Sequence, residues 1–264
     1  MNRFDRFFLC TIFLFCFAAS AQSQEHPELS AVIAATPDFG GTWSDPPPRA
    51  EDAFCHIGCV IEAREYLTSL LDDPTNDEKS YAELKAQAQR FQVTKLLPGY
   101  MTPEALQKRM ANRNPRPLSS VCVPWGLVRT SMAPHAMQLT QHQDHITLYY
   151  SEWTVLRHVY MDGRAPPADL EHSKYGYSVG HFDGDALVVE TTGIVADNFA
   201  AGGFPHSDQT TVTERFYRVG DDRLEVEVLL TDPLTYKQPL RMARAWTWAP
   251  GEEIYPYDNC VVPE

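Results

Sequence analysis

Apolar and polar residues alternate along most of the second half of the chain. In segment 223–231 every second residue is apolar, and these residues are Leu224, Val226, Val228 and Leu230. Successive side chains of a strand point to opposite faces of a sheet, so this pattern predicts a strand with one buried face. Similar patterns predict strands over residues 136–141, 145–152, 155–161, 210–218, 241–247 and 253–257.

The stretch 176–192 predicts a hairpin. Its turn is an Asp-Gly pair at 183–184, and the strand after the turn covers 185–192. Asp-Gly is a strong turn signal because both residues tolerate a positive φ. Glu190 shares a strand face with Ala186 and Val188. A buried carboxylate on such a face needs a partner or has a raised pKa, so Glu190 is a candidate for chemistry.

Residues 51–112 have helical periodicity instead. One predicted helix ends at Asp72-Asp73-Pro74, and a second covers about 77–91. A third begins at Thr102-Pro103, because Thr is a good N-cap and Pro fits the first helical position. We expect a helical insertion that either packs over an open end of a barrel or acts as the lid of a binding site.

The predicted fold class is mainly β. Gly41-Thr42-Trp43 predicts a short first strand with Trp43 as a core anchor, and the prolines at 46–48 end it. With it, eight or more hairpin-linked strands predict an antiparallel barrel, which has room for one small ligand. We expect residues 22–264 to form a single domain with the helical insertion at about 51–112.

The N-terminus has the features of a cleaved secretory signal peptide over residues 1–21. Arg3 and Arg6 precede an apolar run, and Ala19-Ser20-Ala21 supplies small residues for cleavage. The apolar run is too short for a membrane span, so we expect a secreted or periplasmic protein without one. Cleavage changes the formal charge from −13 to −14. Such an acidic protein is not expected to bind nucleic acid.

Four cysteines follow the signal peptide: Cys55, Cys59, Cys122 and Cys260. In an oxidising compartment an even number predicts two disulfides, with three possible connectivities. Cys55 and Cys59 are close enough to pair locally, and Cys122 would then pair with Cys260. The alternative, a metal site at Cys55-His56-Ile57-Gly58-Cys59, lacks the spacing of a zinc knuckle or of haem attachment.

A string of motifs over about 37–260 resembles a large group of secreted, mostly uncharacterised bacterial proteins. The main ones are Gly41-Thr-Trp43, Cys122-Val-Pro-Trp-Gly126, Tyr160-Met-Asp-Gly-Arg164, Gly176-Tyr-Ser-Val-Gly180, Asp183-Gly-Asp-Ala-Leu-Val-Val-Glu-Thr191, Ser207-Asp208 and Glu214-Arg215-Phe216. This chain has Gly-Tyr-Ser and Gly-His-Phe where the group has Gly-His-Ser and Gly-Arg-Trp. The resemblance implies a calycin-like barrel, similar to a lipocalin in its Gly-Thr-Trp opening, and implies no particular activity.

Charged residues occur on apolar strand faces. Glu152, Glu190 and Glu214 each alternate with aliphatic or aromatic residues, and Arg157 does the same. One interpretation is a network of structural ion pairs at the barrel ends. The other is a polar pocket in which a Glu acts as general base, Arg157 or Tyr160 stabilises an oxyanion, and His181 or His206 transfers a proton.

The catalytic interpretation requires convergence. Glu152, Glu190 and Glu214 would have to meet His181 or His206 around one cavity. Candidate ligand-binding residues beside them are Tyr150, Glu214, Trp246 and Asp208, and the many aromatic residues favour a ring-containing or isoprenoid-sized molecule.

Other site types are disfavoured. The group His135, His142 and His145 could suggest a metal, but alternation sends these side chains to different faces. Neither Ser178 nor Ser207 stands in a Gly-x-Ser-x-Gly elbow. No nucleotide-binding glycine pattern precedes a helix, so we expect neither a metal nor a cofactor.

The sequence therefore predicts a secreted β-barrel that binds a small, largely apolar molecule and acts on it without a cofactor. The reaction would be acid/base chemistry, as in a lyase, isomerase, cyclase or hydrolase. Two alternatives remain, a non-catalytic lipocalin-like carrier and a structural envelope protein.

Overall fold

The computed structural model describes residues 37–44, 60–111, 122–133, 135–200, 203–255 and 260–261. All of them belong to one compact unit, 37–264. The predicted signal peptide, Cys55 and Cys59 lie outside the described residues.

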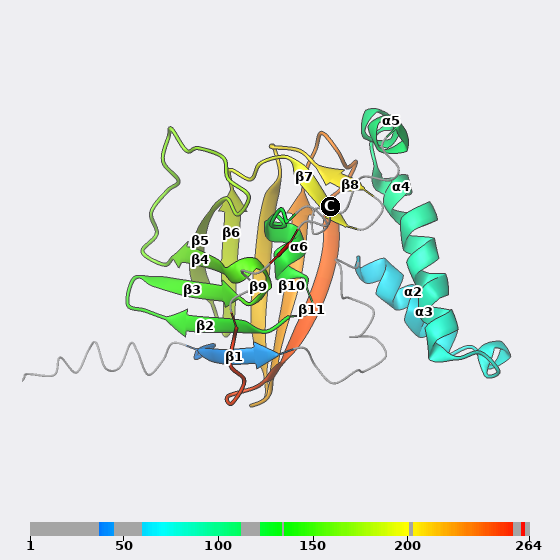
Figure 1. Ribbon diagram of the computed structural model, residues 1–264, viewed down its shortest axis with the longest axis horizontal. Coiled ribbons are helices and arrows are strands. Elements are labelled where there is room, and N and C mark those ends of the chain that lie inside the picture. The colour runs from blue at the N-terminus through cyan, green and yellow to red at the C-terminus, as the bar shows by residue number, and fades with distance from the viewer. Residues whose placement is uncertain are drawn as a thin grey trace, which may run out of the picture. The chain divides into compact units, whose positions relative to one another are not determined.

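Nine strands form a closed barrel, which confirms the predicted fold class (Figure 1). In barrel order they are β1 (Gly41–Ser44), β11 (Leu240–Trp248), β10 (Arg223–Thr231), β9 (Thr211–Val219), β6 (Ala186–Thr192), β5 (Tyr177–Asp183), β4 (Val155–Tyr160), β3 (His145–Tyr150) and β2 (Met137–Gln141). β1 pairs with β11, where Trp43 lies opposite Trp248, and also with β2, where Trp43 lies opposite Met137. Because β1 has a neighbour on both sides, the barrel leaves no open sheet edge.

Alternation along the strands fills the barrel. In β10 the predicted inward residues are at most 2% exposed, and they are Leu224, Val226, Val228 and Leu230. Trp43 is fully buried and donates its indole N–H to the Phe39 carbonyl oxygen at 3.0 Å. The predicted core anchor is therefore in place.

The barrel departs from the predicted antiparallel order at one pair. β4 and β5 run parallel, and Val159 lies opposite Ser178. Parallel neighbours need a crossover rather than a hairpin, and the long segment 161–176 supplies it.

One further strand prediction was wrong, because residues 253–255 of the expected last strand form no strand. A separate two-stranded sheet, for which no strand was predicted, consists of β7 (Asp197–Ala200) and β8 (Phe204–His206).

The predicted helical insertion is present beside the barrel (Figure 1). It contains α2 (Ile61–Leu71), η1 (Pro74–Asn76), α3 (Tyr81–Phe91), the π-helical turn η2 (Gln92–Leu96), α4 (Leu97–Tyr100) and α5 (Pro103–Ala111). α3 begins later than expected because Ser80 and Glu83 form a capping box.

The insertion is joined to the barrel by backbone contacts. Val60, just before α2, forms a β-bridge with Met242 of β11. Thr102 donates its backbone N–H to the Thr235 carbonyl oxygen at 2.9 Å, at the start of α5. The insertion therefore contacts β11 and the turn after β10, and the choice between packing over a barrel end and a lid stays a prediction.

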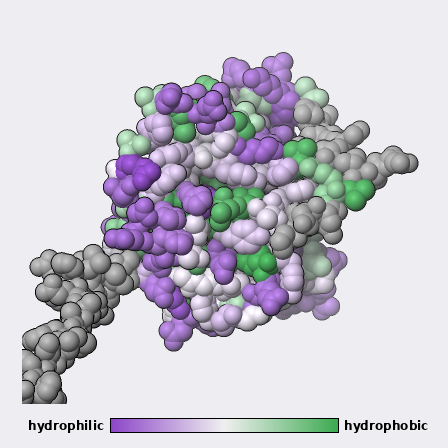
Figure 2. Space-filling model, turned by 60° about the vertical axis from the view of Figure 1, so that its left-hand side comes forward, coloured by the Kyte–Doolittle hydropathy of each residue, from purple (hydrophilic) through white to green (hydrophobic). Residues whose placement is uncertain are grey.

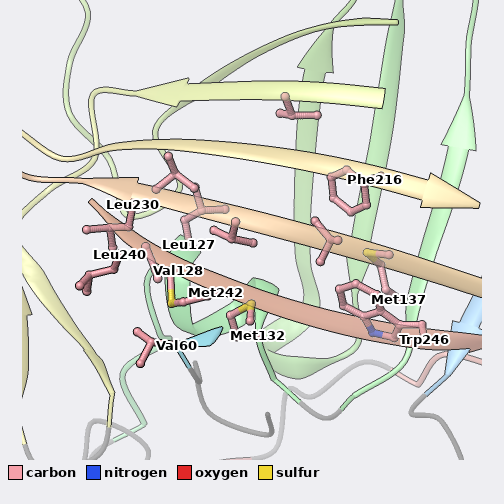
Figure 3. Close-up of a cluster of buried hydrophobic side chains, with 14 of the residues drawn as sticks. Val60, Leu127, Val128, Met132, Met137, Phe216, Leu230, Leu240, Met242 and Trp246 are labelled. Atoms are coloured by element: carbon pink, nitrogen blue, oxygen red, sulfur yellow. The ribbon is translucent and has the colours of Figure 1, made fainter. Parts of the chain in front are cut away.

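A short helix, α6 (Leu127–Ser131), precedes the strands β2 and β3 and was not predicted. Figure 3 places Leu127, Val128 and Met132 together with Met242 and Trp246 of β11. Leu127, Val128 and Met132 are fully buried. α6 therefore contributes an apolar face to the barrel core.

The predicted Cys122–Cys260 disulfide is present and joins residues 138 positions apart. Among the residues that the structure describes, no helix is long and apolar enough to span a membrane. On the face seen in Figure 2, hydrophilic residues predominate and hydrophobic ones form small separate groups.

Candidate functional site

A buried ion pair lies inside the barrel. Arg157 of β4 donates from Nη2 to Glu214 Oε2 of β9 at 2.5 Å, and the two side chains are 2% and 0% exposed. The same guanidinium donates from Nε to Ser178 Oγ at 2.9 Å and from Nη2 to Thr191 Oγ1 at 2.7 Å. Burial by itself lowers the pKa of Arg157, but the charges and hydrogen bonds of Glu214 and Tyr150 together outweigh it and the net change is upward.

Tyr150 completes this interior group. It is 4% exposed, and burial raises the pKa of its hydroxyl, with Glu214 adding to the rise. The Tyr150 hydroxyl interacts with the Arg157 guanidinium, and Glu214 Oε1 has no hydrogen-bond partner among the described residues. Arg157, Tyr150 and Glu214 thus meet in the core, where aliphatic side chains surround them.

The other predicted strand residues do not join this group. Glu190 and His181 are exposed on the outer face of β6 and β5. Tyr160, also on the outer face, stacks on Tyr177 at a ring-centroid distance of 5.0 Å, and the Arg164 guanidinium lies 4.2 Å from its ring. Ala186 and Val188 are the apolar residues on the same face as Glu190. Both are buried, so other parts of the protein cover them from outside the barrel.

Glu152 lies elsewhere again, in the short helix η4 (Glu152–Thr154). One carboxylate oxygen is 2.9 Å from His135 Nε2, and the Glu152 side chain is 12% exposed. The next two residues, Trp153 and Thr154, have positive φ of 61° and 54°. Such backbone is costly for a bulky and a β-branched residue.

Trp246 and Asp208 are also apart. Trp246 is 1% exposed and forms part of the barrel core, with the Arg244 guanidinium 5.2 Å from its ring. Asp208 is exposed in the turn after β8. The three carboxylates therefore do not converge on one cavity, and the catalytic roles predicted for them remain predictions.

A pocket of about 300 Å³ lies between α5, β8 and the turn after β10. Its apolar lining residues are Ala105, Ala196, Gly203, Pro205 and Leu234. The polar ones are Glu104, Lys108, Arg109, Asn198, His206, Ser207 and Thr235. This volume is at the lower end of the range of small-molecule sites.

His206 is the one predicted catalytic residue that lines this pocket. Burial lowers the pKa of its ring, and the nearby charges of Asp197 and Asp232 only partly oppose the change. Nδ1 lies 3.3 Å from the Ser207 carbonyl oxygen. In the tautomer with hydrogen on Nδ1, the ring donates this bond and Nε2 is left with its lone pair.

The loop after His206 is held by Asp232. Ser207 donates from its backbone N at 2.6 Å and from Oγ at 2.7 Å to the two carboxylate oxygens of Asp232, which is 1% exposed. Leu234 and Thr235 donate backbone N–H groups to the same carboxylate. These hydrogen bonds hold the loop that follows His206 in place beside the pocket.

Two cations face the pocket from α5. The Arg109 guanidinium lies 3.9 Å from the ring of Phe204, which precedes His206 by two residues on β8. Lys108 is its neighbour. Neither cation was predicted as a site residue, and their position in the last turn of a helix is an ordinary one for basic residues.

The sequence interpretation also missed a polar group near α6, made of Trp125, Arg129, Thr130, Tyr175 and Asp197. The Arg129 guanidinium lies 4.0 Å from the Trp125 ring, and Trp125 packs edge-on against Trp153 at a ring-centroid distance of 6.4 Å. The Cys122-Val-Pro-Trp-Gly motif marks one end of this group, but the helix that follows the motif was not predicted.

The chain matches no protein-family model and no curated protein.

Proposed function

We propose that the protein binds a small, largely apolar molecule in the pocket between α5 and β8, and that His206 acts on it as a general base. The carrying observation is a buried histidine with a lowered pKa on the wall of a pocket that two cations also line. An imidazole that is neutral near pH 7 is ready to accept a proton. A perturbed titratable group in a pocket is the usual mark of an active site.

The two cations would stabilise the negative charge that forms on the substrate. Proton abstraction leaves negative charge on the substrate, and Arg109 and Lys108 line the same pocket. A positive charge near a developing oxyanion lowers the barrier. The arrangement supports a cofactor-independent isomerase or lyase. In an isomerase, His206 removes a proton from one atom of the substrate and returns it to another; in a lyase, it removes a proton from carbon and gives it to the departing group, such as a hydroxyl that leaves as water.

The pocket limits the size of the substrate. A volume of about 300 Å³ suits a single ring or a short isoprenoid better than a larger terpenoid. The apolar walls would hold the hydrocarbon part of such a molecule.

The apolar walls also favour a second candidate, a carrier that binds without turnover. The two candidates differ in what His206 does. A carrier would keep its affinity when His206 is replaced by an isosteric polar residue, and it would release its ligand unchanged.

The test compares wild type with His206→Gln on a panel of small aromatic and monoterpenoid molecules that carry a carbonyl or hydroxyl group. We expect kcat to fall by about 10²- to 10⁴-fold in the variant, which is the usual contribution of a general base. Glu190→Gln is the matched control, because Glu190 is exposed on the outer barrel face. Equal turnover in both variants would remove His206 from the reaction.

Lys108→Met tests the cationic side of the pocket. We expect a lower kcat with little change in folding stability, and Lys85→Met on α3 is the control outside the pocket. Saturable binding of the panel with no product in the wild type would favour the carrier.

We also propose export to an oxidising compartment, where the Cys122–Cys260 disulfide would persist. Detection of the protein in a periplasmic or culture fraction, with residues 1–21 absent from its N-terminal sequence, is the expected result.

A further inference from the structure

The polar group near α6, here called the α6 cluster, contains Trp125, Arg129, Thr130, Tyr175 and Asp197. Trp125, Arg129 and Asp197 each contribute one buried polar atom with no hydrogen-bond partner among the residues that the structure describes, and the hydroxyls of Thr130 and Tyr175 have no such partner apart from each other. The atoms are Trp125 Nε1, Arg129 Nε, Thr130 Oγ1, Tyr175 OH and Asp197 Oδ2. An unpaired buried polar atom is costly, so such a concentration in one place needs a reason.

The five residues come from separate parts of the chain and meet near the start of α6. A Cβ atom on Gly126 would lie 3.2 Å from Asp197 Oδ2. Leu127 donates its backbone N–H to the Lys174 carbonyl oxygen at 2.9 Å, which brings the loop before β5 onto α6. Burial raises the pKa of Tyr175 and the charge of Asp197 adds to the rise, whereas a hydrogen bond with Thr130 opposes it, so both residues lie close to the Tyr175 hydroxyl.

One cation, Arg129, lies near two carboxylates, Glu152 and Asp197. Burial lowers the pKa of Arg129, and Glu152 and Asp197 are close enough to oppose that change. Asp197 Oδ1 already accepts the Asn198 backbone N–H at 2.7 Å, so only Oδ2 lacks a partner among the described residues. None of the five residues is among those that line the His206 pocket.

We propose that the α6 cluster is a binding site for a small neutral polyhydroxylated molecule, such as a monosaccharide or another polyol. The polar atoms of the cluster include two pure donors, two hydroxyls and one pure acceptor. A ligand hydroxyl can accept from Arg129 or Trp125 and donate to Asp197 at the same time. The aromatic rings of the cluster would pack against the C–H faces of the ligand.

Charged ligands fit this set of atoms less well. A carboxylate would satisfy the donors but would lie beside the carboxylates of Asp197 and Glu152. An ammonium group would satisfy Asp197 but would face the Arg129 guanidinium. Either arrangement buries like charges together, which is unfavourable in a low-dielectric site.

Entry to the site involves Trp153. Its ring contacts Trp125, and its backbone and that of Thr154 are held at positive φ. A change of backbone conformation at these two residues would relieve strain while it moved the indole. Binding is therefore expected to alter the fluorescence of Trp125 and Trp153.

The experiment titrates the protein with D-glucose, myo-inositol and glycerol, followed by calorimetry and intrinsic tryptophan fluorescence. Acetate and methylammonium serve as charged probes of similar or smaller size. We expect saturable binding of at least one polyol, accompanied by a fluorescence change. No saturable binding of any polyol, or tighter binding of acetate or methylammonium, would overturn the proposal.

Isosteric variants separate binding from folding. Tyr175→Phe and Thr130→Val each remove a hydroxyl whose partner among the described residues is the other hydroxyl, so we expect the free energy of unfolding to fall by no more than about 1 kcal/mol. We expect the affinity for the polyol to fall by about tenfold in each, and likewise in Asp197→Asn. Unchanged affinity in all three variants would contradict the assignment, and so would a loss of stability without a loss of affinity.

This site does not rest on the function proposed for His206. Polyol binding is expected to persist in His206→Gln, whatever that substitution does to turnover. Loss of polyol binding in His206→Gln with normal binding in Tyr175→Phe would place the ligand in the pocket and refute the α6 cluster as its site.

Discussion

The guanidinium of Arg157 and the carboxylate of Glu214 face each other across the barrel interior, at 2.5 Å and with almost no exposed surface. The pair joins β4 to β9, which are not neighbours in the barrel. Ser178 and Thr191 hold the guanidinium in place from the intervening strands. The network therefore links four strands through one side chain.

Glu214→Gln is expected to lower the free energy of unfolding by about 3–5 kcal/mol, because it leaves the Arg157 charge buried without a counter-charge. Glu190→Gln, an exposed position on β6, should change it by less than about 0.5 kcal/mol. Denaturant unfolding followed by circular dichroism measures both values.

The double replacement Arg157→Met with Glu214→Leu should cost less than Glu214→Gln alone, because neither charge then remains buried. Equal stability of Glu214→Gln and wild type would show that the pair contributes nothing to the fold.

Gly41 closes the barrel at β1 and is expected not to tolerate a side chain. Its φ is +129°, and a Cβ atom there would lie 2.0 Å from two ring atoms of Trp248. Gly41→Ala should destabilise the protein by roughly 2–5 kcal/mol, from steric overlap and backbone strain together.

Gly184→Ala is the matched control in the β5–β6 turn. It also has a positive φ, of +59°, but nothing lies within 4 Å of its Cβ position. Only the backbone cost of about 1–2 kcal/mol is expected there. Thermal unfolding of both variants measures the difference, and equal losses would mean that the Trp248 contact relaxes without cost.

The Cys122–Cys260 disulfide is expected to stabilise the barrel by about 4–5 kcal/mol, since it closes a loop of 138 residues. The double variant Cys122→Ser with Cys260→Ser should unfold at correspondingly lower denaturant concentration. The wild type measured with and without a thiol reductant is the companion test. Coincident unfolding curves would show that the bridge constrains little in the unfolded chain.

His206 should make the stability depend on pH. Its pKa in the folded protein is lowered by burial, whereas an unfolded histidine has a pKa of about 6.5. As the pH falls below about 7, the unfolded chain therefore takes up this proton before the folded one does. The free energy of unfolding should fall until the pH drops below the folded pKa, and this contribution then stays constant.

His206→Gln should make that dependence shallower between about pH 7 and pH 5, as measured by denaturant unfolding at a series of pH values. His172→Gln is the control, because His172 is exposed. Identical slopes for His206→Gln and wild type would mean that His206 takes up its proton equally in both states.

Local patterns predicted much of the architecture. Alternation in 223–231 identified a strand and its inward face, and the Asp-Gly turn at 183–184 identified a hairpin. Thr102 and Pro103 marked the start of α5 at the correct residue. These features depend on neighbours within a few positions, so the sequence states them directly.

The pairing of β4 with β5 and the helix α6 could not be obtained in this way. The direction of a pair depends on the path of the connection between the strands, and segment 161–176 has no pattern that reveals it. In α6, five residues are too few for a clear period, and burial against β11 decides their conformation.

The candidate sites divide along the same line. By itself, the sequence identified side chains with unusual surroundings, and Arg157, Glu214 and His206 are among the buried polar residues. Only the tertiary structure decided that the face of β6 carrying Glu190 is the outer one. It also decided that His206 lines the same pocket as Arg109 and Lys108, and that Asp197 lies near Arg129. Strand periodicity defines two faces but not which of them the barrel encloses, and closure of the barrel around a shared core makes that choice.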